Sequence, residues 1–153
     1  MQIITHSQRQ TFDLGKKLSR WLKSGDIVCL YGPFGAGKTV LVKGIAFGLG
    51  VSKDKVNSPA FVLINEYKGK KTNLYHIDLY RIKNIWDVIT TGYEDYFYKE
   101  GLIVIEWAQK LPVYLMPASY LKVKFEIIDK NTRKIDIFSE GNRYNFILDK
   151  LKK

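Results

Sequence analysis

The stretch that decides the fold is DIVCLYGPFGAGKTVLVKGIAFGLG, residues 26–50. Its first part, residues 26–31, is a compact apolar run typical of a buried parallel strand. The helical pattern over residues 39–50 closes at Gly50. Four residues between strand and helix fit the pattern G-x-x-x-x-G-K-[ST]: Gly32, Gly37, Lys38 and Thr39. Strand, glycine-rich loop and helix in this order predict a site for the phosphate groups of ATP or GTP.

In such a loop the backbone N–H groups point at phosphate oxygens, at the positive end of the helix dipole. The lysine neutralises the phosphates and the hydroxyl coordinates magnesium. The predicted phosphate contacts are therefore Gly35, Ala36, Gly37, Lys38, Thr39 and Val40.

Phosphate chemistry also needs an acidic group for magnesium or for the attacking water, placed where another strand ends beside the loop. Asp78 follows LYHI, residues 74–77, in the manner of an acid at the end of a strand, and Glu106 follows LIVI, residues 102–105, in the same way. A salt bridge at the sheet edge is the alternative for either acid, but the neighbouring loop favours function. Arg81 could contact phosphate or pair with Asp78, and the sequence leaves that choice open.

The composition is that of a folded chain. Of 153 residues, 46% are hydrophobic and 26% charged, which argues against disorder and fits one domain over residues 1–153. No apolar run approaches the roughly 18 residues of a bilayer span, and residues 1–10 lack the features of a secretion signal. Cys29 is the only cysteine, so an internal disulfide is excluded and a buried core position is expected. We expect a cytoplasmic protein without a membrane partner.

The net charge of +10 leaves contact with nucleic acid open. However, lysines far outnumber arginines, and bidentate phosphate recognition favours arginine. His6 and His76 are too isolated to form a metal site, and His76 reads as an ordinary strand histidine.

Periodicity and turn residues predict the other elements. The capping-box spacing of Ser7 and Gln10 starts a helix over residues 7–23. Further elements follow in order: a turn at 57–59, a strand to 67, a hairpin into 74–80, short helices in 84–98, a buried strand at 101–107, two strands within 120–138 and a terminal helix from 141. Together they predict an α/β fold, a P-loop NTPase domain with a mixed, mainly parallel central sheet flanked by helices.

Several stretches together resemble one family, the bacterial TsaE (YjeE) ATPases of tRNA threonylcarbamoyladenosine biosynthesis. These stretches are DLGKKL, residues 25–50, NSPAFVLINEY, HIDLYR, GYEDY and IEW. The resemblance covers residues 7–112 in consistent order and is far more specific than the loop alone. It implies an ATPase, dependent on ATP and Mg²⁺, that supports turnover of the TsaB–TsaD threonylcarbamoyl transferase. TsaB and TsaD are therefore the expected partners, and direct contact with tRNA is left open.

The resemblance also assigns roles. Lys38 binds phosphates, Thr39 and Glu106 lie at the metal, and Asp78 is the strand-end acid needed for activity. Weaker candidates for nucleotide contact are Gln109 and Arg133, with Gln8 and Thr11 near the base.

Two residues depart from the family pattern. Ala60 stands where the family has a threonine hydroxyl, and Val40 replaces another hydroxyl in the loop. Nucleotide binding is therefore expected to survive, because Val40 keeps its backbone N–H, and hydrolysis is expected to be weakened. Two alternatives stay open: a small-molecule kinase, for which no arginine-bearing lid is apparent, and a nucleotide-gated binding module. Residues 58–67 are the segment expected to respond to the nucleotide.

Overall fold

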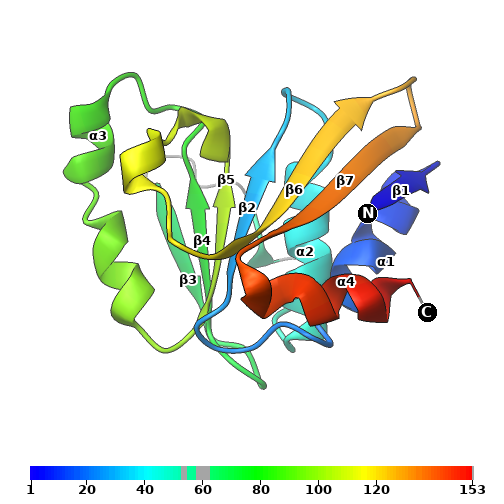
Figure 1. Ribbon diagram of the computed structural model, residues 1–153, viewed down its shortest axis with the longest axis horizontal. Coiled ribbons are helices and arrows are strands. Elements are labelled where there is room, and N and C mark those ends of the chain that lie inside the picture. The colour runs from blue at the N-terminus through cyan, green and yellow to red at the C-terminus, as the bar shows by residue number, and fades with distance from the viewer. Residues whose placement is uncertain (53–54, 58–62, 153) are drawn as a thin grey trace.

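The computed structural model describes residues 1–52, 55–57 and 63–152. Within these residues seven strands form one sheet, and helices cover both of its faces (Figure 1). The strands are β1 (Gln2–Thr5), β2 (Ile27–Tyr31), β3 (Ile64–Tyr67), β4 (Leu74–Asp78), β5 (Leu102–Glu106), β6 (Tyr120–Ile127) and β7 (Arg133–Glu140). The α-helices are α1 (Gln8–Leu18), α2 (Lys38–Gly48), α3 (Ile85–Ile89) and α4 (Asn145–Leu151). Short 3₁₀ helices are η2 (Tyr93–Tyr98), η3 (Ala108–Lys110), η4 (Val113–Leu115) and η5 (Asn142–Tyr144).

The strand order is β1-β7-β6-β2-β5-β4-β3. The four central strands, β6, β2, β5 and β4, are parallel, while β3, β7 and β1 pair antiparallel at the two sides. The predicted α/β fold with a mixed sheet flanked by helices is thus confirmed. Because parallel strands end at the same sheet edge, the ends of β2, β4 and β5 meet there.

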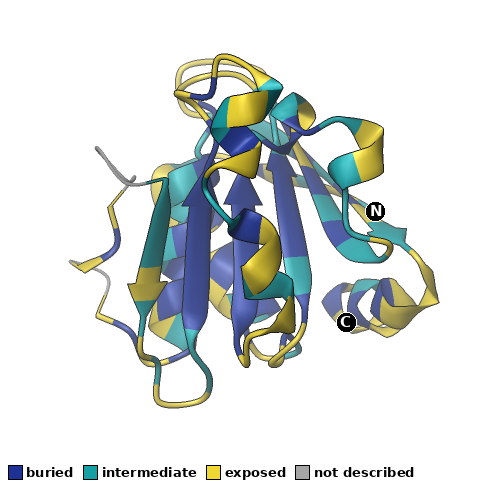
Figure 2. Ribbon diagram, turned by 90° about the vertical axis from the view of Figure 1, so that its left-hand side faces the viewer, coloured by how far each residue is buried: buried dark blue, intermediate teal, exposed yellow. Residues whose placement is uncertain are grey.

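The sheet separates two apolar layers. On one face Leu30, Val104 and Val123 pack with residues of α1, α2 and α4. On the other face Ile77 and Ile105 pack with residues of α3, η2 and the segment after β5. Figure 2 shows the central strands buried along most of their length, as their continuous apolar runs require.

Helix α1 begins as predicted but ends earlier. The hydroxyl of Ser7 accepts a hydrogen bond from the Gln10 N–H at 3.2 Å, which caps the helix. The helix stops at Leu18 rather than continuing to residue 23. The chain turns instead, with the Ser19 hydroxyl donating to the Lys16 carbonyl oxygen at 2.8 Å. Hydroxyl competition for helix carbonyls explains the early end, which the apolar periodicity did not reveal.

Helices α1 and α2 touch backbone to backbone. A Cβ atom added to Gly44 would lie 2.0 Å from the carbonyl oxygen of Phe12, and one added to Gly15 would lie 2.3 Å from that of Leu41. Only glycine permits this approach. Because α2 begins at the glycine-rich loop, the contact fixes α1 beside that loop.

The helix predicted after the loop, its closing glycine and the buried cysteine are all found in the structure. The predicted helix after the loop is α2, and Gly50 takes the left-handed conformation beyond its end, with φ of +87°. Cys29 is fully buried, as expected. In the described residues, no helix combines the length and apolarity that crossing a bilayer demands.

Candidate functional site

The glycine-rich loop joins β2 to α2 with a backbone that glycine alone adopts readily. Gly32, Gly35 and Gly37 have φ angles of +138°, +73° and +98°. A Cβ atom at Gly32 would also lie 2.8 Å from the carbonyl oxygen of Phe125 on β6. Two of the three glycines thus match the sequence pattern, and the loop has the strand-to-helix setting that the pattern requires.

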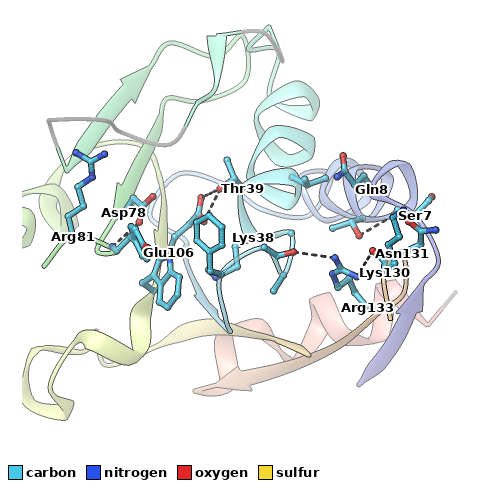
Figure 3. A pocket seen from close by; sticks show the side chains of 18 of the residues that line it. Ser7, Gln8, Lys38, Thr39, Asp78, Arg81, Glu106, Lys130, Asn131 and Arg133 are labelled. Carbon is cyan, nitrogen blue, oxygen red and sulfur yellow. Dashed lines mark hydrogen bonds between the residues drawn. The ribbon is translucent and has the colours of Figure 1, made fainter. Parts of the chain in front are cut away.

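The loop forms one wall of a cavity of about 540 Å³. The predicted residues Gly35, Ala36, Gly37, Lys38, Thr39, Val40, Gln8, Thr11, Asp78, Glu106 and Arg133 all line it. In Figure 3, Asp78 and Arg81 lie to one side of Lys38 and Thr39, while Gln8, Ser7 and Asn131 lie to the other. The cavity therefore has an acidic end at the strand termini and a polar end beside α1.

Lys38 is buried at the centre of this arrangement. Its Nζ donates hydrogen bonds to the carbonyl oxygens of Gly32 at 2.8 Å and Pro33 at 2.7 Å. Burial lowers the pKa of the Lys38 ammonium, and the negative charges of two nearby carboxylates oppose that change. A cation with so little water around it is a strong partner for a phosphate oxygen.

Thr39 and Glu106 form the floor of the cavity. The Thr39 hydroxyl lies 2.9 and 3.1 Å from the two carboxylate oxygens of Glu106 (Figure 3). Glu106 is buried at the end of β5, next to the strand that leads into the loop. Hydroxyl and carboxylate oxygens are the ligands that magnesium prefers.

The described residues contain no group of three or more His, Cys, Asp or Glu side chains able to hold a metal ion. Magnesium seldom relies on such a cage, because it is commonly held by one or two protein oxygens together with phosphates of the substrate. The pair formed by Thr39 and Glu106 fits that mode of binding.

Asp78 lies beside Glu106, opposite it in the β4–β5 register. Its Oδ1 accepts a hydrogen bond from the Tyr80 N–H at 2.9 Å. Burial raises the pKa of the Asp78 carboxyl, the Tyr80 hydrogen bond lowers it, and the charge of Glu106 raises it further. Two neighbouring buried carboxyl groups, of which Asp78 has a raised pKa, are suited to holding or moving a proton near a bound phosphate.

The polar end of the cavity joins residues far apart in the sequence. Arg133 donates to the carbonyl oxygen of Gly35 at 3.2 Å and so ties β7 to the loop. The Thr11 hydroxyl lies 2.9 Å from that of Thr5 and 3.3 Å from the Ser7 carbonyl oxygen. Gln8 is exposed on the wall, with its side chain available to a ligand.

Gln109 is the one predicted contact that does not line the cavity. Its Nε2 donates to the carbonyl oxygen of Gly32 at 3.2 Å. Residues 58–62 lie outside the described residues, and with them Ala60 and the first half of the segment at 58–67.

Sequence reasoning missed a further set of wall residues: Ser7, Phe34, Leu63, Tyr80, Trp107, Lys130 and Asn131. Tyr80 lies two positions after Asp78, and Trp107 directly follows Glu106. Their closeness in sequence to the two strand-end acids could have indicated that they line the same cavity. Their rings lie 5.1 Å apart, and Phe34 lies 5.7 Å from Tyr80. Lys130 and Asn131 reach the cavity from the β6–β7 turn, which no local pattern relates to the loop.

Fold and cavity together place the chain among the α/β proteins that carry a glycine-rich loop between a central parallel strand and the following helix. The family model described as "Threonylcarbamoyl adenosine biosynthesis protein TsaE" matches residues 5–135. The chain belongs to the TsaE family.

Individual relatives agree with the family match. The tRNA threonylcarbamoyladenosine biosynthesis protein TsaE of Bacillus subtilis is 34% identical over 147 residues, which is 96% of this chain and 90% of that protein. The Aquifex aeolicus protein of the same name is 36% identical over 138 residues, covering 90% of this chain and 95% of its own. The crystal structure of Bacillus subtilis YdiB superposes with a TM-score of 0.81 at 31% identity, covering 99% of this chain and 93% of that one.

Proposed function

We propose that this protein is an ATPase of tRNA threonylcarbamoyladenosine biosynthesis, which binds ATP with Mg²⁺ and hydrolyses it to ADP and phosphate. The observation that carries the proposal is the contact between the Thr39 hydroxyl and the Glu106 carboxylate, at 2.9 and 3.1 Å, on the floor of a cavity walled by the glycine-rich loop. Family membership supports the biosynthetic role, since the relatives carry that name.

The cavity suits a nucleoside triphosphate in size and polarity. Its volume of about 540 Å³ lies within the range of small-molecule sites. The loop amides and Lys38 would hold the phosphates, while Gln8 and Arg133 lie at the end left for the nucleoside. Thr39 and Glu106 would hold magnesium, which when bound neutralises charge on the phosphate oxygens.

Asp78 and Glu106 have different roles in this proposal. Glu106 is already engaged with Thr39, whereas Asp78 presents a carboxyl with a raised pKa at the neighbouring strand end. Asp78 is thus the better candidate to orient or deprotonate an attacking water.

We further propose that ATP turnover serves the partner proteins TsaB and TsaD. A small ATPase that acts on a partner needs a nucleotide-dependent surface more than rapid hydrolysis. We expect slow release of phosphate by the chain alone, stimulation by TsaB and TsaD together, and a cytoplasmic location.

The test is phosphate release from ATP by the purified chain, alone and with TsaB and TsaD, in matched variants. Glu106→Gln removes the charge at the floor of the cavity and should reduce the rate about 100-fold. Glu126→Gln is the control, because Glu126 is a half-exposed residue of β6 that pairs with Lys134 away from the cavity. Its rate should match that of the unmodified protein.

Other outcomes identify the alternatives. Transfer of the phosphoryl group to an added small molecule would show a kinase. Binding of ATP without release of phosphate, with or without TsaB and TsaD, would show a nucleotide-gated module. Equal rates of phosphate release in Glu106→Gln and Glu126→Gln would overturn the proposal that Thr39 and Glu106 hold the magnesium needed for hydrolysis.

A further inference from the structure

His76 is a fully buried polar residue in the middle of β4, between apolar neighbours. Its Nε2 lies 2.8 Å from Oε1 of Glu106. Within the part of the chain that the structure describes, its Nδ1 has no hydrogen-bond partner. Burying a half-satisfied imidazole costs free energy that an apolar side chain at this position would avoid. The strand itself therefore gives no reason for a histidine.

The bond to Glu106 crosses the sheet diagonally. His76 stands opposite Val104 in the β4–β5 register, and Glu106 stands two residues further along β5. Residues two apart on a strand point to the same face, so the imidazole can reach along that face to the carboxylate.

Glu106 therefore receives two donors from two elements. The Thr39 hydroxyl donates from α2, and the imidazole donates from β4. Since a carboxylate oxygen accepts, Nε2 carries the hydrogen in this bond. The bond engages Oε1, and together with the Thr39 bond it sets the direction in which the carboxylate faces.

We propose that His76 is the positioning residue for Glu106, holding its carboxylate against Thr39 in the orientation that binds magnesium. This inference rests on the proposed function, because it assigns a role to a neighbour of the proposed metal ligands. Partners of this kind fix the geometry of a ligand, and their loss typically weakens metal binding ten- to hundredfold. Loss of His76 should therefore weaken the binding of Mg²⁺ and leave the affinity for the metal-free nucleotide unchanged.

The experiment measures binding of the non-hydrolysable analogue AMP-PNP by calorimetry, first in EDTA and then across a Mg²⁺ titration. His76→Leu removes the donor, and His76→Gln keeps an N–H group at a similar reach. We expect His76→Leu to need ten- to hundredfold more Mg²⁺ for half-maximal enhancement of binding. His76→Gln should restore most of the loss, and affinity in EDTA should not change in either variant.

Ile77→Val is the matched control for lost packing. Ile77 is also fully buried in β4, but it belongs to the apolar layer on the opposite face of the sheet. If this control shifted the Mg²⁺ requirement as much as His76→Leu does, or if His76→Leu shifted nothing, the positioning role would be refuted.

His76→Asn covers the case in which His76→Leu fails to fold. Its amide is too short to reach Glu106 but remains polar, so it should lose the Mg²⁺ response that His76→Gln keeps. Equal responses in the two amide variants would count against the inference. The proposed function itself fails separately, if the unmodified protein shows no Mg²⁺-dependent binding of AMP-PNP.

Discussion

The ammonium of Lys38 lies 4.0 Å from the centroid of the Trp107 ring. Trp107 directly follows Glu106, and its backbone has φ of +60°, a left-handed conformation unusual for a bulky residue. The turn brings the indole back to the cavity, where its face attracts the cation. Lys38 is therefore held by the ring as well as by the loop carbonyl groups, before any ligand binds.

Replacing Lys38 tests whether this cation binds phosphate. Lys38→Ala removes a charge-assisted contact of about 1.5 to 3 kcal/mol, so affinity for ATP should fall roughly ten- to hundredfold. Isothermal calorimetry with Mg²⁺ measures the change. Lys43→Ala is the control, since Lys43 lies on the same helix but does not line the cavity. Unchanged ATP affinity in Lys38→Ala would refute the assignment of the glycine-rich loop as the phosphate site.

The glycine contact between α1 and α2 predicts a stability defect. Gly44→Ala places a methyl group 2.0 Å from the Phe12 carbonyl oxygen, so the helices must separate. Overpacking of this kind costs about 1 to 3 kcal/mol in the free energy of unfolding. Urea denaturation checks the value, with Lys43→Ala expected within about 0.5 kcal/mol of the unmodified protein. A Gly44→Ala protein of full stability would show that the helices are not in backbone contact.

The raised pKa of Asp78 predicts a pH dependence of stability. Between its ordinary pKa of 3.8 and its raised value, the folded state holds the proton and the unfolded state has released it. Stability therefore falls as pH rises through this window, and the cost stays at higher pH. Asp78→Asn lacks this cost and can still accept the Tyr80 hydrogen bond. Its stability relative to the unmodified protein should rise from pH 4 to pH 7.

Urea denaturation of both proteins at the two pH values measures this difference. Other titrating groups are shared by the two chains, so they largely cancel. A difference that stayed constant, or one that shrank towards pH 7, would contradict a desolvated carboxyl at position 78.

An ion pair is among the contacts that hold the C-terminal segment to the start of β2. Arg143 Nε lies 2.6 Å from Oδ1 of Asp26, a carboxylate that is only 2% exposed. Arg143→Ala leaves that buried oxygen without its charged partner, and should destabilise the fold by about 1 to 3 kcal/mol in thermal or urea unfolding. Arg9→Ala, which breaks the exposed pair with Asp13, should cost less than about 1 kcal/mol. Similar losses of unfolding free energy in both variants would mean that the buried Arg143–Asp26 pair stabilises the fold no more than an exposed pair does.

Local patterns predicted the parts of the site that are local in sequence. The glycine-rich loop carries its geometry in its own residues, because a positive φ demands glycine there. Asp78 and Glu106 were found because each stands at the end of a predicted strand, and parallel strands end together. Likewise, the Ser7 cap was visible in its spacing to Gln10.

What the sequence did not reveal depends on pairings between distant segments. His76 read as an ordinary strand histidine because nothing in β4 shows that it faces Glu106 across the sheet. Lys130 and Asn131 reach the cavity only because β6 lies next to β2, which places the β6–β7 turn beside the loop. Gln109 does not line the cavity, because the 3₁₀ turn after β5 directs its side-chain amide to the Gly32 carbonyl oxygen.

The close approach of α1 to α2 has a consequence for ligand entry. Since the two helices share a backbone contact, the loop and the wall residues Gln8 and Thr11 form one rigid half of the cavity. Among the described residues, the other half comes from the ends of β4 and β5 and from the β6–β7 turn. We therefore expect a nucleotide to enter and leave by displacement of these later turns, while α1, the loop and α2 keep their places relative to one another.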